Sequence, residues 1–206
     1  MTPGKTGREY GPYVKVFNRC NRWSKRGLWQ DIFAALAGCS KPPGAAMIDG
    51  TAMRAHRAAS GQRGERGQAI GRSRGGRTTK IHALIDQAGR PLAFHLTGGN
   101  IADVTVAAPL LCQLAPSAWL IGDKGYDADH LRALLDSRGT IAVIPNKANR
   151  KRRFPFDAER YKWRNVIERT NCRIKDFRAI ATRYDKLARN FLAGLCLVTA
   201  LIYWCD

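Results

Sequence analysis

Acidic residues are scarce in this sequence. Its 206 residues include 16 Asp and Glu against 35 Lys and Arg, which gives a formal charge of +19 at pH 7. A folded domain with this excess repels itself unless it binds a polyanion, and nucleic acid is the most common one. An anionic membrane surface is the weaker alternative, and a basic domain without such a partner is the simplest one. Because acids are few, a carboxylate in a recognisable pattern is more informative than usual.

Patterns typical of zinc sites or disulfide frameworks are also absent. The six cysteines are widely scattered, without a C-x-x-C pair or a Cys/His cluster. We therefore expect reduced thiols in a cytoplasmic, nucleoid-associated protein. The histidines show no mutual spacing and are interpreted as surface or strand residues: His56, His82, His95 and His130.

Long apolar runs are missing. The first ten residues contain none, so no signal peptide is expected. Near the C-terminus, residues 191–205 are mostly apolar and uncharged, but a membrane span needs about 20 such residues. We interpret this stretch as a buried terminal helix and expect no membrane partner.

Hydrophobic residues make up 45% of the chain, enough for the core of one full-sized domain. Residues 1–11 lack any pattern and are expected to be disordered. Apolar residues between 12 and 36 recur at helical spacing, broken near Gly27, which predicts two short helices. The run KPPG at 41–44 indicates a linker. We therefore predict a short helical segment at 1–40 and a domain at 45–206.

The pattern after residue 45 predicts an α/β fold. An early hairpin around Asp86–Gly89 precedes β-α-β units, which favours a mixed five-stranded sheet flanked by helices. Residues 54–77 are rich in Arg, Gly and Ser and are expected to be mostly loop, either mobile or ordered by a phosphate backbone. The predicted strands cover 45–48, 80–85, 91–97, 118–121 and 140–144, and the predicted helices cover 102–114, 127–137, 161–175 and the terminal stretch.

The segment 161–175 combines two faces when it is drawn as a helix. Four functional side chains fall within an arc of about 60°: Tyr161, Arg164, Glu168 and Lys175. Apolar side chains fall on the opposite side and are expected to be core: Trp163, Val166, Ile167, Ile174 and Phe177. An ordinary surface helix with solvated charges would show the same pattern.

Two further carboxylates stand at the ends of predicted strands. Asp49 follows the strand at 45–48, and Asp123 follows the strand at 118–121. Neighbouring strands and a helix packed on the sheet can bring Asp49, Asp123 and Glu168 to one point. Such a group can hold two Mg²⁺ or Mn²⁺ ions for phosphodiester chemistry. Because three carboxylates repel one another, the site without metal should hold another cation or be partly disordered.

The sequence around these residues resembles the DDE transposases of bacterial insertion sequences, most closely the insertion sequence five group. Tyr161, Arg164, Glu168 and Lys175 reproduce the spacing of the third motif of that family without a gap. The first motif resembles IDGT at 48–51, and the second resembles IGDKGYD at 121–127. The stretch RGGRTTKIHALID at 74–86 is similar to the family's segment between its two Asp residues.

The resemblance implies an RNase H-like fold, and metal-dependent hydrolysis at transposon ends followed by attack of a 3′-hydroxyl on target DNA. It implies that Asp49, Asp123 and Glu168 are the catalytic ligands of two Mg²⁺ or Mn²⁺ ions. It also implies contacts with DNA from Tyr161, Arg164 and Lys175. The expected partners are the terminal inverted repeats, target DNA and a second copy of the chain in a homodimer.

A basic run at 146–153 is a further candidate for contact with the DNA backbone, although a solvated loop has the same composition. Its candidate residues are Lys147, Lys151, Arg152 and Arg153. Asp86 and Asp103 are interpreted as turn and helix-start residues, and Cys172 as a packing residue.

The N-terminus departs from the family pattern. Members begin with a helical DNA-binding domain, and residues 1–40 resemble only the end of one, so we interpret them as its remnant. Two alternatives therefore stay open. One is a catalytically inactive DNA-binding fragment or partner subunit, and the other is a different two-metal nuclease on the same fold.

Overall fold

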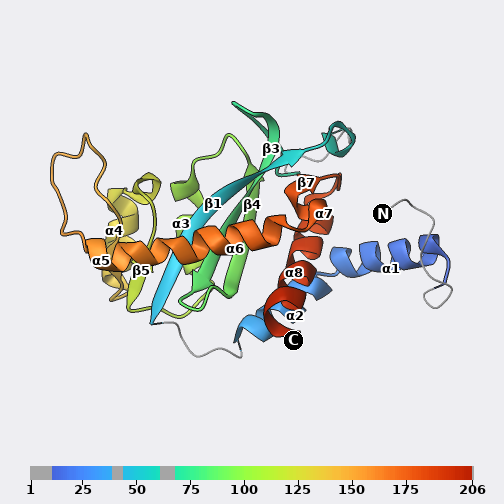
Figure 1. The fold of residues 1–206 in the computed structure, drawn as a ribbon, viewed down its shortest axis with the longest axis horizontal. Helices are drawn as coiled ribbons and strands as arrows, with labels where there is room; N and C mark the ends of the chain where they lie inside the picture. The colour runs from blue at the N-terminus through green and yellow to red at the C-terminus, as the bar shows by residue number, and fades with distance from the viewer. Residues whose placement is uncertain (1–10, 39–43, 61–67, 206) are drawn as a thin grey trace.

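The computed structural model describes residues 11–38, 44–60 and 68–205 (Figure 1). The predicted disorder at 1–10 and the linker at 41–43 lie outside the described residues. The strands are β1 (Ala45–Ala55), β2 (Gly71–Ser73), β3 (Gly76–Asp86), β4 (Pro91–Gly98), β5 (Trp119–Ile121), β6 (Ile141–Val143) and β7 (Thr182–Arg183). The α-helices are α1 (Tyr13–Lys25), α2 (Leu28–Gly38), α3 (Ala107–Leu111), α4 (Asp129–Ser137), α5 (Ala158–Tyr161), α6 (Asn165–Lys175), α7 (Arg178–Ala181) and α8 (Ala188–Trp204). Short 3₁₀ turns are η2 (Arg57–Ser60), η3 (Asp103–Val106), η4 (Lys124–Tyr126) and η5 (Lys162–Arg164).

Strand β1 is the centre of a mixed sheet. It pairs antiparallel with β3, which pairs antiparallel with β4 on its other side, so the predicted hairpin is confirmed. On its opposite edge β1 pairs parallel with β5, and β5 pairs parallel with β6. These are the five predicted strands. In the described part of the chain, β2 extends the sheet beside β3 and β7 extends it beside β1.

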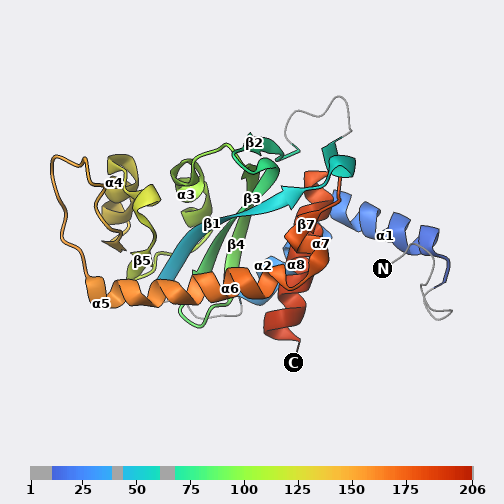
Figure 2. The same cartoon turned by 45° about the horizontal axis from the view of Figure 1, so that its top comes forward.

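Helices lie on both faces of the sheet (Figures 1 and 2), and alternating side chains of β1 belong to two different cores. Met47 belongs to a core shared with Ile167 of α6, Leu195 of α8 and Phe33 of α2. Ile48 points to the other face, where the core contains residues of α3 and α4. This period of two follows from the pleat of a strand, and it places Asp49 on the face covered by α6.

The two N-terminal helices differ in how they join this body. Phe33 of α2 stacks on Phe94 of β4 at 5.2 Å between ring centroids and meets Trp204 of α8 edge-on at 6.0 Å. Helix α1 buries only Ser24 and projects away from the sheet (Figure 1). The predicted pair of helices is therefore confirmed, and α2 shares the core of the sheet.

Several boundaries differ from the prediction. β1 runs through to Ala55 and does not end at Ile48, because its whole length pairs with β3. The predicted loop at 54–77 contains the end of β1, the turn η2, the strand β2 and the start of β3. The predicted helix at 102–114 is split into η3 and α3. The terminal helix α8 is confirmed, and no described helix has the length and apolar character needed to cross a membrane.

A buried arginine ties the sheet to the end of the chain. Arg183 of β7 is fully buried and donates to the carbonyls of Asp185 and Lys186, at 2.8 and 3.2 Å. It also donates to the Thr79 hydroxyl at 2.7 Å, and its guanidinium lies 5.3 Å from the centre of the Phe191 ring. Burial lowers the pKa of Arg183 to about 10, so it stays charged at neutral pH.

We predict that Arg183→Met lowers the free energy of unfolding by about 3 kcal/mol, because two carbonyls and a hydroxyl lose their donor. Urea denaturation followed by circular dichroism measures the change. The control is Arg178→Met on the exposed surface of α7, which should change stability by less than about 0.5 kcal/mol. Equal stability of the two variants would contradict a structural role for Arg183.

Candidate active site

Asp49 lies inside β1, where Asn171 of α6 and Arg164 of the preceding turn η5 contact its carboxylate. Asn171 Nδ2 donates to Asp49 Oδ2 at 3.0 Å, and Arg164 Nη2 lies 3.5 Å from Asp49 Oδ1. Burial raises the pKa of Asp49, the Arg164 guanidinium lowers it, and the Asp123 charge raises it further, so that the pKa stands above its ordinary value. Asp49 is thus a half-buried acid in an electrostatic group with Arg164 and Asp123.

Asp123 follows the parallel neighbour of β1. The register of these strands pairs Met47 with Ile121, so Asp49 and Asp123 each stand two residues beyond a paired position. Asp123 Oδ1 accepts a hydrogen bond of 2.7 Å from the Gly125 N–H and caps the turn η4. The parallel pairing of β1 and β5 therefore gives Asp49 and Asp123 equivalent positions on neighbouring strands.

Glu168 joins this group through Arg164. Arg164 Nη1 contacts Glu168 Oε1 at 2.5 Å while Nη2 faces Asp49, so one guanidinium lies between the two carboxylates. In this arrangement the guanidinium is the cation that separates the acids. Among the described residues, no three Asp, Glu, His or Cys side chains converge closely enough to form a ready-made metal group.

The predicted helix 161–175 is divided into α5, the 3₁₀ turn η5 and α6. Ile167 and Ile174 are buried as predicted, but Trp163 and Phe177 are 50% and 40% exposed. The buried side of α6 also includes Thr170 and Asn171. The Thr170 hydroxyl donates a hydrogen bond to the Gly89 carbonyl, and the Asn171 amide donates one to Asp49. The prediction that Trp163 is core was therefore wrong.

Asn171 is the residue of this centre that the sequence pattern missed. It stands three positions after Glu168 and seven after Arg164, which places it on the same side of α6. That spacing was the available signal. Of the other predicted contact residues, Tyr161 is half-buried and packs edge-on against Phe156 at 5.2 Å, and Lys175 is half-buried at the end of α6.

A further acid, Asp103, lies close to the backbone of β1 at Gly50. Asp103 begins η3 as predicted, and its Oδ1 lies 3.0 Å from Lys80 Nζ and 3.5 Å from His82 Nδ1. Burial lowers the pKa of His82 to about 4, so it is neutral at physiological pH. A Cβ atom on Gly50 would stand 2.2 Å from Asp103 Oδ1, so only glycine allows this contact.

The donor chemistry of the first group fits divalent ions. Asp49, Asp123 and Glu168 offer hard carboxylate oxygens, the ligands that Mg²⁺ and Mn²⁺ prefer. A cationic group already lies between Asp49 and Glu168, so positive charge is favoured at this point. Asp49 and Asp123 are held by hydrogen bonds, whereas Glu168 is 55% exposed and contacts Arg164.

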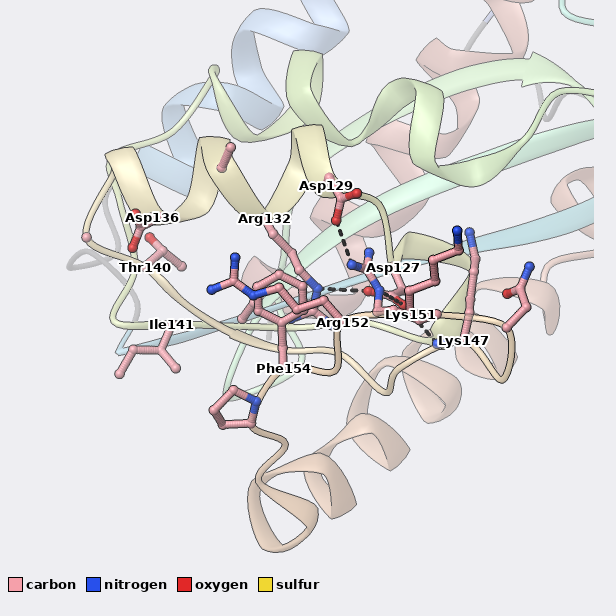
Figure 3. A pocket seen from close by; sticks show the side chains of 16 residues that line it. Asp127, Asp129, Arg132, Asp136, Thr140, Ile141, Lys147, Lys151, Arg152 and Phe154 are labelled. Carbon is pink, nitrogen blue, oxygen red and sulfur yellow. Dashed lines mark hydrogen bonds and ion pairs between the residues drawn. The ribbon is translucent and has the colours of Figure 1, made fainter.

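A basic hollow of about 1120 Å³ lies beyond Asp123, between α4, β6 and the loop 146–154 (Figure 3). Asp127, the last residue of the second motif, is fully buried there. Its carboxylate accepts hydrogen bonds from Arg132 Nε, Arg150 Nε and the Lys147 N–H at 2.8, 2.7 and 2.8 Å. Of the predicted basic residues, Lys151, Arg152 and Arg153 are exposed and Lys147 is half-buried.

The sequence matches the protein family described as Transposase DDE domain over residues 40–204. A Brucella ovis protein named "Putative transposase for insertion sequence element IS6501" is 36% identical over 130 residues, covering 61% of this chain and 98% of that protein. A Burkholderia cepacia protein named "Putative transposase for insertion sequence element IS402" is 35% identical over 137 residues, covering 61% of this chain and 63% of that protein. The predicted resemblance to insertion-sequence DDE transposases is confirmed, and the insertion sequence five group stays a prediction.

A similar solved structure is a piggyBac transposase synaptic complex with hairpin DNA, determined by cryo-electron microscopy. The TM-score is 0.51 at 10% identity, and the match covers 78% of this chain and 46% of that chain. At this identity the likeness bears on the fold alone. Together with the mixed sheet flanked by helices, it confirms the predicted RNase H-like fold.

We predict that Gly50→Ala lowers the free energy of unfolding by about 1–3 kcal/mol, because the new methyl group displaces Asp103 and presses on His82. Urea denaturation measures the loss. Gly194→Ala is the matched control, since nothing lies within 4 Å of a Cβ atom there and alanine favours helix α8. A Gly50→Ala protein as stable as the control would show that the close approach of Asp103 to Gly50 does not contribute to stability.

Proposed function

This chain belongs to the Transposase DDE domain family, and on that premise we propose that it is a DNA transposase of a bacterial insertion sequence. It hydrolyses phosphodiester bonds at the terminal inverted repeats and transfers the freed 3′ ends to target DNA. The observation that carries this proposal is that a single guanidinium contacts both Asp49 and Glu168. Residues from β1 and α6 thereby share one charged centre, beside the strand end that bears Asp123.

Asp49, Asp123 and Glu168 are the proposed ligands of two Mg²⁺ or Mn²⁺ ions. When bound, such ions lower the pKa of an attacking water or hydroxyl and stabilise the leaving oxygen. The contacts of Asn171 and of the Gly125 N–H keep the Asp49 and Asp123 carboxylates in a fixed orientation. Arg164 contacts two acids, and it would be available to a DNA phosphate if bound divalent ions compensated them.

Tyr161, Arg164 and Lys175 are the proposed DNA contacts near the scissile bond. Phosphates on both sides of that bond carry negative charge, and cations beside them offset it. The domain assignment belongs to the same proposal: residues 45–206 form the catalytic domain and residues 1–40 are a helical N-terminal segment related to a DNA-binding domain. We also propose that two copies act together on paired ends, as a homodimer on DNA.

The alternative function is DNA binding without catalysis, as an inactive fragment or a partner subunit. The net charge of +19 favours DNA binding under either proposal. Cleavage separates the two. A chain that binds DNA with a steep salt dependence and never nicks it, with either metal, fits the alternative.

We predict that Glu168→Gln lowers the rate of Mg²⁺- or Mn²⁺-dependent nicking at inverted-repeat ends by at least about 100-fold, because the amide is a much weaker metal ligand than the carboxylate. The assay follows a labelled duplex that carries the ends of the element. The control is Glu159→Gln, an exposed acid of α5 that pairs with Lys162 at 2.7 Å. It should nick at the rate of the unmodified chain. Equal nicking by both variants would remove Glu168 from the mechanism.

A further inference from the structure

The loop 146–154 has a folded shape of its own. Asn146 Nδ2 donates to the Phe154 carbonyl, and the Phe154 N–H donates back to Asn146 Oδ1, both at 2.9 Å. This reciprocal pair closes the two ends of the loop. The Arg150 N–H donates to the Lys147 carbonyl at 3.1 Å and forms a turn within it. A basic run that was expected to be either solvated loop or DNA contact therefore has a shape that its own hydrogen bonds define.

One buried acid fixes the loop to the domain. The Asp127 carboxylate receives Arg150 Nε and the Lys147 N–H from the loop and Arg132 Nε from α4. Arg132 Nη2 also donates to the Ile144 carbonyl at 2.9 Å, and Arg150 Nη1 pairs with Asp129 at 2.6 Å. Burial by itself would raise the pKa of Asp127, but these hydrogen bonds outweigh it and lower the pKa to about 2. The anchor is therefore ionised at all physiological pH values.

The Phe154 ring completes the anchor. Three guanidiniums lie within 6 Å of its centre, those of Arg132, Arg150 and Arg152, at 4.4, 5.0 and 5.8 Å. Figure 3 shows Arg132 and Arg152 beside the Phe154 ring and Asp127. Cation–π contacts of this kind stabilise the position of the ring. Arg132 and Arg150 are thus used inside the fold and are not available to a ligand.

A second set of cations is left on the outside. Lys151, Arg152 and Arg153 are exposed, and within the described part of the chain no acid forms an ion pair with them. Figure 3 places Lys147 and Lys151 at one end of the hollow and Asp136 at the other, so the positive charge is concentrated at the loop. Consecutive cations on a folded loop suit a row of phosphates, because little ordering entropy is lost on binding.

The position of the loop relates it to the acidic centre. Asp127 follows Asp123 by four residues, with the turn η4 between them. The loop then leads into α5, η5 and α6, which carries Glu168. The same short stretch of chain therefore fixes one acid of the centre and the anchor of the loop.

We propose that residues 146–154 form a prefolded surface that binds the phosphate backbone of duplex DNA beside the acidic centre, and that Asp127 is the positioning residue that holds it. This inference rests on the proposed function and adds the partner of one particular surface. It gives Asp127 an unusual role, since an acid is required for binding a polyanion.

The decisive variant is Asp127→Asn in the full-length chain. Removing a negative charge should tighten DNA binding if only net charge matters. The proposal predicts the opposite, a weakening of about fivefold or more, because Lys147 and Arg150 lose their anchor. Asp136→Asn is the matched control: it removes the same charge from an exposed residue of the same hollow. It should leave the affinity unchanged or slightly higher.

Affinity is measured by fluorescence anisotropy with a labelled duplex, in EDTA and over a range of salt concentrations, so that no cleavage occurs. Replacing Lys151, Arg152 and Arg153 together by Gln should reduce the slope of log K against log salt by about 2 or more, since each phosphate contact contributes about 0.9. Circular dichroism and thermal unfolding establish that each variant is folded. An unchanged slope in the folded triple variant overturns the proposal.

Asn146→Ala provides a second test that involves no charge and no core residue. It opens the loop, and the proposal predicts a weakening of duplex binding similar to that of Asp127→Asn. Should both variants be folded and bind as tightly as the unmodified chain, Asp127 is not a positioning residue. A single-stranded RNA of equal length bound as tightly, with the same loss in the triple variant, would overturn the assignment to duplex DNA.

The test can fail independently of the proposed function. Nicking with Mg²⁺ or Mn²⁺ depends on the acidic centre, whereas binding in EDTA depends on the loop. Loss of nicking in Glu168→Gln together with unchanged binding in the loop variants would leave the transposase proposal standing and remove this inference. Loop-dependent binding without any nicking would do the reverse.

Discussion

The candidate site depends on one interaction, the pairing of the Arg164 guanidinium with both Asp49 and Glu168. Asp49 comes from the middle of the central strand, Asp123 from the end of its parallel neighbour and Glu168 from a helix that crosses the sheet. The Asp123 charge raises the pKa of Asp49, and the Arg164 guanidinium lowers it. Arg164 stands in the turn η5, four residues before Glu168. The segment that carries Glu168 therefore also carries the cation that compensates the acids.

In the basic loop the charges are reversed, because buried cationic groups are compensated there by one carboxylate. Arg132, Arg150 and the Lys147 N–H would be costly to bury without a partner, and a single buried carboxylate receives all three. Asp123 of the acidic centre and Asp127, which anchors the basic loop, stand four residues apart, on either side of η4. In a chain with 16 acids and 35 basic residues, the Asp127 carboxylate is used to fix the backbone of the loop. Lys151, Arg152 and Arg153 stay on the surface.

Much of this fold was accessible from the sequence, because apolar periodicity decides which residues enter a core. The hairpin, the later strands at 118–121 and 140–144 and the terminal helix were predicted correctly. Periodicity failed where polar residues are buried. Thr170 and Asn171 take the place expected of Trp163 and Phe177, because hydrogen bonds to Gly89 and Asp49 satisfy them. Asp127 was visible only as part of a motif, since its partners Arg132 and Arg150 are revealed by tertiary contact.

The three acids of the centre are not held equally. Asp49 is bound by Asn171 within a strand paired on both edges, and Asp123 is bound by the Gly125 N–H at the start of η4. The Glu168 side chain is 55% exposed on a helix surface, and its contact is with Arg164 on the same helix. Two acids are therefore positioned by the backbone, and the third can change its orientation by rotating its own side chain. Binding of divalent ions at this centre would then require side-chain motion of Glu168 and Arg164, with the sheet and α6 left in place.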